Sequence, residues 1–180
     1  MRIPTLFFVL SMVVTFAAVP GFADTAAEID GDVDEALQRF RSEVEGADAF
    51  LKNAAGVLVF PRVIKAGVGV GGEYGQGALR VGGKTVDYYS TAAGSFGFQL
   101  GAQAKSIVIA FMTAESLEKF RNSAGFKVGV DGSIALIDLG AGKSIDTANI
   151  KDPVVGFVFG SKGLMYNLTL EGTKFTKLDK

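Results

Sequence analysis

The chain has 180 residues, with 19 acidic and 18 basic side chains and neither histidine nor cysteine. Without histidine, Ser-His-Asp catalysis and most zinc chemistry are excluded, and without cysteine there are no disulfides and no thiol nucleophile. We therefore expect a protein that is not an enzyme and that holds no cofactor or metal.

The first 23 residues have the pattern of a secretory signal peptide. Arg2 supplies a positive charge, an apolar run follows over residues 5–19, and Pro20 precedes small residues at the −3 and −1 positions of a cleavage site after Ala23. The apolar run is shorter than the roughly 20 residues of a membrane-spanning helix. We expect export to the periplasm or cell envelope, with peripheral attachment, because no cysteine is present to carry a lipoprotein anchor.

The mature chain, residues 24–180, is expected to form one domain, with an acidic helix over 24–52 and a β-rich body over 53–180. Apolar residues recur at helical spacing from about residue 26 to 52, and Gly31 and Gly46 could divide this helix. The segment 24–52 has nine acidic and three basic residues, so its net charge is −6, whereas residues 53–180 carry +4. This split predicts an electrostatic contact between the two parts, a basic surface for an anionic partner, or two solvated faces.

Beyond residue 56, short apolar runs alternate with glycine and predict many short strands. The candidates are residues 57–60, 66–73, 77–81, 85–90, 95–100, 106–112, 127–130, 133–138, 154–159, 164–170 and 174–178. Gly82-Gly83 and Asp131-Gly132 predict tight hairpin turns, and Thr113 predicts the N-cap of a short helix that ends before Gly125. We expect an α+β fold with an antiparallel, glycine-rich sheet or barrel-like core.

Gly67, Gly69 and Gly71 alternate with Val68 and Val70, which leaves one face of the predicted strand without side chains. Glycine inside a strand predicts close approach of another backbone or a sheet corner, so Gly69→Val is expected to be destabilising. The spelling Gly67-x-Gly69-x-x-Gly72 matches a dinucleotide fingerprint, but no helix can begin directly after it.

Other classes of protein fit the sequence less well. Two lysines that follow glycines, Lys84 and Lys143, lack the upstream glycine of a phosphate loop. The basic residues are scattered and form no tract, so no nucleic-acid partner is expected. An outer-membrane barrel is an alternative, but the chain has no tryptophan, only four tyrosines and mostly short predicted strands.

Three blocks of the sequence, at residues 53–80, 88–120 and 161–172, resemble the SYLF domain family, the lipid-binding domain also known as the actin-binding domain of a yeast actin-patch protein. The first block reads NAAGVLVFPRVIKAGVGVGGEYGQGALR, the second YYSTAAGSFGFQLGAQAKSIVIAFMTAESLEKF and the third SKGLMYNLTLEG. The resemblance implies a non-enzymatic domain that binds lipid or an anionic membrane surface. An envelope structural or adaptor protein that binds a protein partner is the alternative.

The resemblance also implies lipid-binding residues. Lys65, in the Lys-Ala-Gly step of the first block, and Lys162, in the Ser-Lys-Gly of the third, match basic positions of the family. Arg62 is added because it lies close to Lys65 in the chain. Eukaryotic members are also credited with a basic amphipathic N-terminal segment, whereas residues 26–52 are acidic here. We therefore expect membrane contact through the basic body and not through the first helix.

Overall fold

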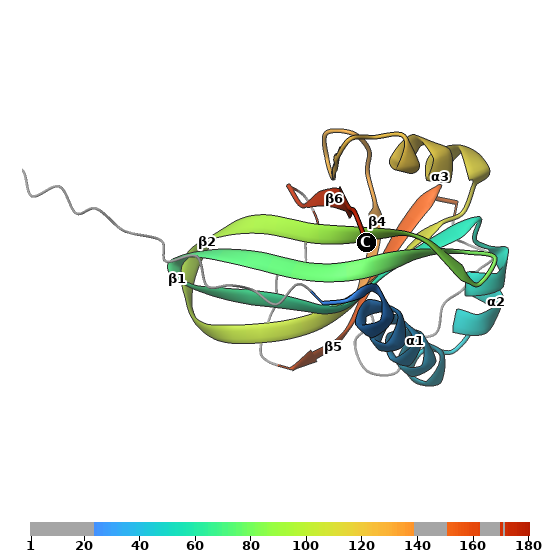
Figure 1. Cartoon of the computed structure of the whole chain (residues 1–180). Coiled ribbons are helices and arrows are strands. Elements are labelled where there is room, and N and C mark those ends of the chain that lie inside the picture. Colours follow the sequence, from blue (N-terminus) through green and yellow to red (C-terminus); the bar gives the residue numbers. More distant parts are fainter. Residues whose placement is uncertain (1–23, 139–150, 163–169, 171) are drawn as a thin grey trace, which may run out of the picture.

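The computed structural model describes residues 24–138, 151–162, 170 and 172–180 (Figure 1). The predicted signal peptide and nearly all of the predicted strand at 164–170 lie outside these ranges. Three helices and six strands are described: α1 (Ala26–Glu43), α2 (Ala47–Asn53), β1 (Gly56–Val81), β2 (Lys84–Phe111), α3 (Ala114–Arg121), β3 (Phe126–Lys127), β4 (Ala135–Asp138), β5 (Val154–Lys162) and β6 (Lys174–Leu178). The predicted α+β class is confirmed.

The N-terminal helical stripe forms two helices, α1 and α2. Thr25 caps α1 through a capping box with Glu28, and the buried side of α1 includes Val33 and Phe40. Gly46 lies between the two helices in the left-handed conformation, with φ 84°, which glycine adopts without steric cost. Of the two glycines that could divide the predicted helix, Gly46 does so, whereas Gly31 lies inside α1.

Strands β1 and β2 form one long antiparallel hairpin, paired from Gly56↔Phe111 to Val81↔Lys84. The predicted turn at Gly82-Gly83 is confirmed, and both glycines have positive φ. The prediction of three separate short strands on each side of that turn was wrong. Its glycines were interpreted as strand ends, but they lie within continuous strands and interrupt the pairing only at local register shifts.

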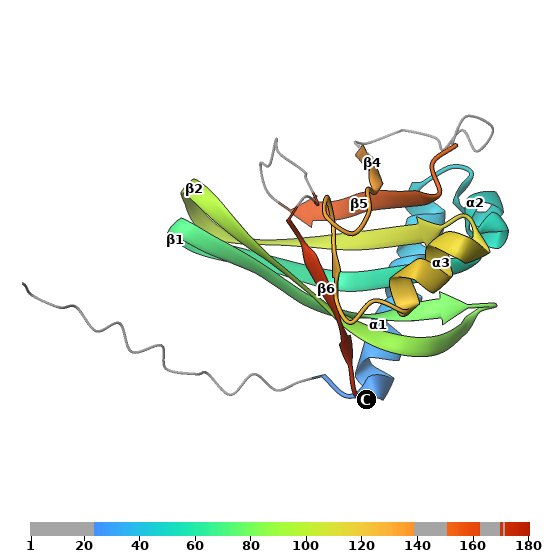
Figure 2. The same ribbon diagram turned by 90° about the horizontal axis from the view of Figure 1, so that it is seen from above.

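The hairpin is folded over on itself at its glycine-rich middle (Figures 1 and 2). A Cβ on Gly75 would lie 2.6 Å from the carbonyl oxygen of Arg62, and a Cβ on Gly77 would strike the carbonyl oxygen of Val59. The second half of β1 therefore crosses directly against the first half, a close backbone approach at Gly75 and Gly77, a few residues beyond the alternating glycines for which it was predicted. The surroundings of Gly69 itself lie outside the described side chains.

We call residues 64–74 of β1 and 92–104 of β2 the bend. The register shift between Gly67 and Gly69 lies within the bend. The other end of the hairpin, at Gly82-Gly83, lies beside α1 and α2, whereas the bend projects away from the helices (Figures 1 and 2).

The remaining strands extend the sheet on both sides of β2, in the order β3-β6-β2-β5-β4, with β1 also paired to β2. Strand β6 pairs with the first half of β2 and β5 with the second half, so the folded hairpin curves the sheet into a half-barrel. All pairs of described strands are antiparallel except β4 with β5, which corrects the expectation of an antiparallel sheet. The chain between Asp138 and Val154 is long enough for the return that a parallel pair requires.

The predicted hairpin around Asp131-Gly132 was wrong in its pairing. A turn is present, where the Lys127 amide donates to Asp131 at 2.6 Å, but β3 pairs with β6 and not with the following strand. The short helix matches its prediction, since Thr113 caps α3 and accepts a hydrogen bond from the Ser116 amide at 3.1 Å.

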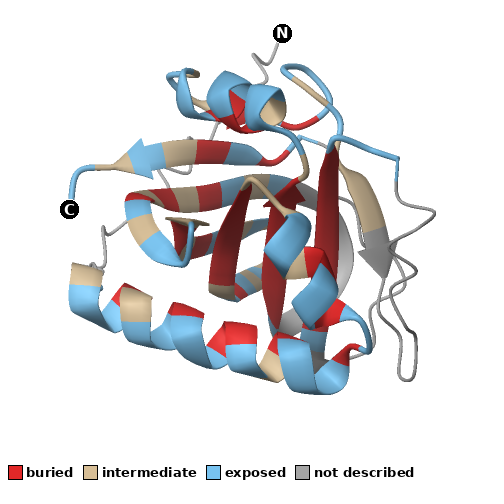
Figure 3. Cartoon of the chain, turned by 90° about the vertical axis from the view of Figure 1, so that its right-hand side faces the viewer, coloured by how far each residue is buried: buried red, intermediate tan, exposed pale blue. Residues whose placement is uncertain are grey.

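Two apolar cores lie on the two faces of the curved sheet (Figure 3). Alternate residues of β1 serve different cores: Val57 and Val59 pack toward α1 and α2, and Leu58 and Phe60 pack in the concave interior with residues of α3 and β6. Within the described ranges, none of the helices is both long and apolar enough to cross a membrane.

Candidate functional site

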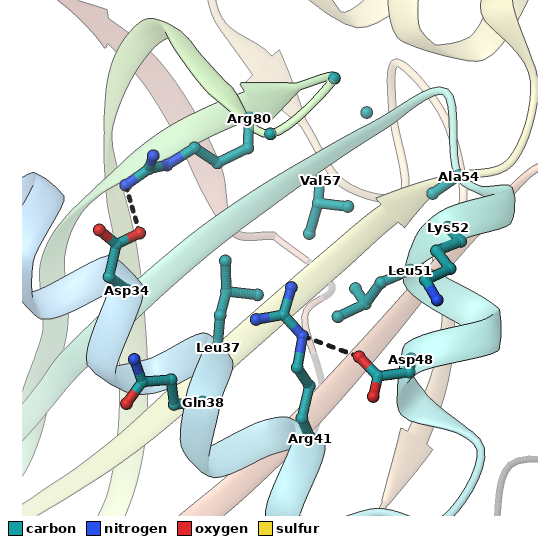
Figure 4. Close-up of a pocket in the computed structure, with 13 residues that line it drawn as sticks. Asp34, Leu37, Gln38, Arg41, Asp48, Leu51, Lys52, Ala54, Val57 and Arg80 are labelled. Atoms are coloured by element: carbon teal, nitrogen blue, oxygen red, sulfur yellow. Dashed lines mark hydrogen bonds and ion pairs between the residues drawn. The ribbon is translucent and has the colours of Figure 1, made fainter.

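A groove of about 550 Å³ lies between α1, α2 and the turn end of the hairpin (Figure 4). Its walls come from both helices, from the first residues of β1, and from Arg80 and the Gly82-Gly83 turn. The groove exists because Gly46 lets α2 leave the axis of α1, so the two helices meet at an angle above the sheet. Its volume falls within the range of small-ligand pockets.

The floor of the groove is apolar. Leu37 of α1, Leu51 of α2 and Val57 of β1 lie there, and all three belong to or pack against the helix-side core. The floor is therefore held in place by the same contacts that attach the helices to the sheet. It offers an apolar surface to an occupant of the groove.

The rim of the groove carries three cations and two carboxylates. Arg80 pairs with Asp34 at 2.8 Å, and Arg41 pairs with Asp48 at 3.0 Å. Lys52 has no ion pair within the part of the chain that the structure describes, so its ammonium is available to an anionic occupant of the groove. The Nε of Arg80 is buried without an acceptor among the described residues, so this guanidinium also has unused capacity to donate a hydrogen bond.

Asp30 of α1 fastens the helix beside this groove to the hairpin. Its carboxylate accepts hydrogen bonds from the Thr85 hydroxyl at 2.6 Å and from the Tyr88 hydroxyl at 2.9 Å, and Arg80 lies 3.5 Å away. Burial raises the pKa of Tyr88, and its hydrogen bond to Asp30 adds to the rise. Of the three interpretations of the charge split, the structure favours an electrostatic contact between helix and body at this place.

Lys65, one of the predicted lipid-binding residues, is largely covered. Its ammonium lies 3.5 Å from the Glu73 carboxylate, which also lies 2.7 Å from the ammonium of Lys105. The Lys65 side chain is 18% exposed and that of Lys105 is 7% exposed. The three residues form an ionic cluster inside the half-barrel, near the bend.

The other two predicted residues lie at the same end of the sheet. Lys162 ends β5, and its backbone pairs with Ala104, which pairs in turn with Ile64, the neighbour of Lys65. The side chain of Lys162 is outside what the structure describes. Arg62 is exposed and lines a small cleft that also contains Asp32, Glu35 and Arg39. The fold thus brings the backbones of the three predicted positions to one region but assigns none of them to the groove.

Sequence reasoning did not find the groove. Arg80 was counted among scattered basic residues, and Arg41 and Lys52 were counted only in the charge balance of the acidic segment. The available signals were the charge split and the glycine at position 46, but neither reveals which strand residues meet which helix residues.

Comparison with known families gives one match. A family model described as "Ysc84: Las17-binding protein actin regulator" matches residues 92–180. The match covers most of β2 and everything after it, so Lys162 lies inside the matched region, and the groove residues and Lys65 lie before it. No curated protein matches the chain.

Proposed function

Because the chain carries a domain of the Ysc84 family, also known as the SYLF family, over residues 92–180, we propose that it is an exported, non-enzymatic protein that binds lipid or the membrane surface. The resemblance in the three sequence blocks agrees with the matched family. The absence of histidine and cysteine from all 180 residues supports a binding role over catalysis.

The groove is the observation that carries this proposal. It combines an apolar floor with a rim on which three cations face two carboxylates, and this is the chemistry that an anionic amphiphile needs. The headgroup would contact Arg41, Lys52 and Arg80, and the apolar part would lie against Leu37 and Leu51. A charge-assisted contact and apolar burial each add affinity.

The test is recovery of lipid with the protein. The full chain is produced in bacteria, and the processed protein is purified without detergent and examined by native mass spectrometry and lipid extraction. Lys52→Glu reverses the one rim cation that has no ion pair among the described residues, and Lys119→Glu on α3 is the matched control, because both are exposed lysines on helices. We expect bound anionic lipid in the wild type and the control, and a clear loss in Lys52→Glu. Wild-type protein free of lipid would contradict the proposal.

The alternative is an envelope adaptor that binds a protein partner. The matched family description names a partner protein, Las17, and this favours the alternative to that extent. A lipid-free wild type that captures one specific envelope protein by cross-linking would replace the lipid proposal with the adaptor proposal.

Export is tested separately. We expect N-terminal sequencing of the envelope fraction to begin at Asp24, and Ala23→Leu to block processing, because the peptidase accepts only small residues at this position. A chain that begins at Met1, or that remains in the cytoplasm, would refute the export proposal.

A further inference from the structure

The outer face of the bend exposes two large apolar side chains. Ile64 is 47% exposed and Tyr74 is 52% exposed. Both lie on β1, one on each side of the fold-over, and they point away from the interior contact that Gly75 makes with Arg62 and Val63. Exposed apolar residues scattered singly need no explanation, but a patch of them does.

The described outer positions within the bend carry no charge, and the exposed Lys174 lies at its border, opposite Ala92 in the register. The exposed positions beside them and opposite them in the register are small: Ala66, Gly72, Ala92, Gly94 and Ala104. In the sequence, residues 66–72 and 88–104 contain no Asp, Glu, Lys or Arg. Small or apolar residues at all of these described outer positions are unusual for a water-facing sheet, where charged residues normally occupy the outer positions.

The charged residues of this region face the opposite way. Lys65, Glu73 and Lys105 occupy the alternate positions of the same strands and pair with one another inside the half-barrel. The normal arrangement, with charge outside and apolar residues inside, is therefore inverted at the bend. This inversion fits an apolar environment outside the bend.

We propose that the outer face of the bend is the surface through which the protein enters a lipid bilayer interface, an inference that rests on the function proposed above. Tyr74 suits this position, because tyrosine places an apolar ring and a polar hydroxyl at the headgroup level. The backbones of β1 and β2 are paired with each other through the bend, so the amide and carbonyl groups between the two strands are satisfied.

Positive charge lies directly behind this surface. Arg62 is exposed two residues before Ile64, on the same side of the strand by alternation, and Lys174 of β6 is exposed in the same register row as Tyr74 and Ala92. Cations at this depth complement anionic headgroups while the apolar residues reach further in. This combination favours a lipid bilayer over an apolar protein surface as the occupant.

The experiment compares two double variants of the full chain in sedimentation with vesicles of phosphatidylethanolamine and phosphatidylglycerol. Ile64→Glu/Tyr74→Glu changes the bend. Val86→Glu/Val130→Glu is the matched control, because these are the other exposed large apolar residues among those described, and neither lies in the bend. We expect the bend variant to lose about tenfold or more in partitioning, since two half-exposed apolar side chains no longer enter the lipid, and the control to bind as the wild type. Raised salt should remove only the headgroup part of wild-type binding.

Each other outcome has a defined meaning. Equal binding of the wild type and both double variants overturns the inference and leaves the proposed function intact, whereas a wild type that does not bind vesicles overturns the proposed function and the inference with it. A wild-type dimer that the bend variant dissociates, with vesicle binding unchanged, identifies the surface as a contact between copies and also overturns the inference. If the glutamates impair folding in thermal unfolding, Ile64→Thr/Tyr74→Thr replaces them, because threonine suits strands.

Discussion

At the turn end of the hairpin, α1 and α2 cover the strands, and the charged residues of strand and helix meet at the surface: Arg80 reaches Asp34 at 2.8 Å, and Thr85 donates to Asp30 at 2.6 Å. At the bend, 64–74 with 92–104, Lys65 and Glu73 face inward and the outer positions that the structure describes are apolar or small. The same two strands therefore present opposite surfaces at their two ends. The difference teaches that one end is covered by the protein itself, whereas the other lacks such a cover among the described residues and is the end that we propose to contact the bilayer.

Some glycines of the hairpin are needed for close packing and others are not. Among the changes considered, Gly77→Ala is expected to have the largest effect on stability. The Cβ of the new alanine would strike the carbonyl oxygen of Val59, and this oxygen cannot easily move because it belongs to the backbone. We expect a loss of about 3 kcal/mol or more in the free energy of unfolding, measured in urea.

Gly94→Ala in the bend is the control, because a Cβ there would find nothing within 4 Å. We expect it to be neutral, or to stabilise the protein by up to about 1 kcal/mol. Similar losses for the two variants would show that the crossing of the two halves of β1 is not as close as described.

The ionic cluster inside the half-barrel is tested by Glu73→Gln. This change keeps the shape of the side chain but leaves Lys65 and Lys105 without their carboxylate, and the Lys105 side chain is only 7% exposed. We expect a loss of about 2 kcal/mol in the free energy of unfolding, below the value for a fully buried pair. Glu118→Gln, on the exposed side of α3, is the control and should change little. An unchanged Glu73→Gln protein would mean that the inverted charges of the bend do not stabilise the fold.

At the turn end, Asp30→Ala removes the acceptor for Thr85 and Tyr88 and one partner of Arg80. Because Asp30 is partly exposed, we expect a loss of only about 1 kcal/mol in urea unfolding. Asp32→Ala, on the exposed side of the same helix, should be close to neutral. Equal effects of the two variants would contradict the fastening role of Asp30.

The smallest expected effect is that of Tyr89→Phe in the concave core. Burial raises the pKa of Tyr89 from its usual 10.0 to about 12, and the charge of Asp87 adds to the rise. Below pH 10 the phenol is protonated in both the folded and the unfolded chain, whereas between 10 and about 12 only the unfolded chain loses the proton. The stability of the wild type should therefore fall as the pH rises through this window.

The measurement is the free energy of unfolding against pH for the wild type, for Tyr89→Phe and for the exposed-site control Tyr74→Phe. At neutral pH Tyr89→Phe should be neutral or slightly stabilising, since the Tyr89 hydroxyl is buried without a partner among the described residues. Above pH 10 it should lose less stability than the wild type. A steeper alkaline loss in Tyr89→Phe would contradict the assigned burial.

Much of the local structure could be predicted from the sequence. The helical stripe, the break at Gly46, the turn at Gly82-Gly83 and the N-cap at Thr113 each depend on neighbouring residues alone, and each is present. The alternating glycines predicted a corner or a close approach, and Gly75 and Gly77 show the close approach a few residues further on.

The rest depends on contacts between residues far apart in the chain. Glycines inside a continuous strand look the same in sequence as glycines that end strands, so β1 and β2 were divided wrongly. The parallel pairing of β4 with β5, and the meeting of Arg80 with Asp34, follow from topology and leave no local pattern. Lys65 was chosen as a basic residue of a family motif, and the sequence could not show that Glu73 covers it.

The most direct test of the contrast between the two ends uses single labels, which is simple because the chain has no cysteine of its own. Tyr74→Cys at the bend and Val86→Cys near the turn end are each labelled with a fluorophore that responds to polarity, and phosphatidylethanolamine–phosphatidylglycerol vesicles with and without a lipid-borne quencher are added. The account predicts a blue shift and quenching at position 74 and no change at position 86. A response at position 86 alone, or the same response at both positions, would contradict it.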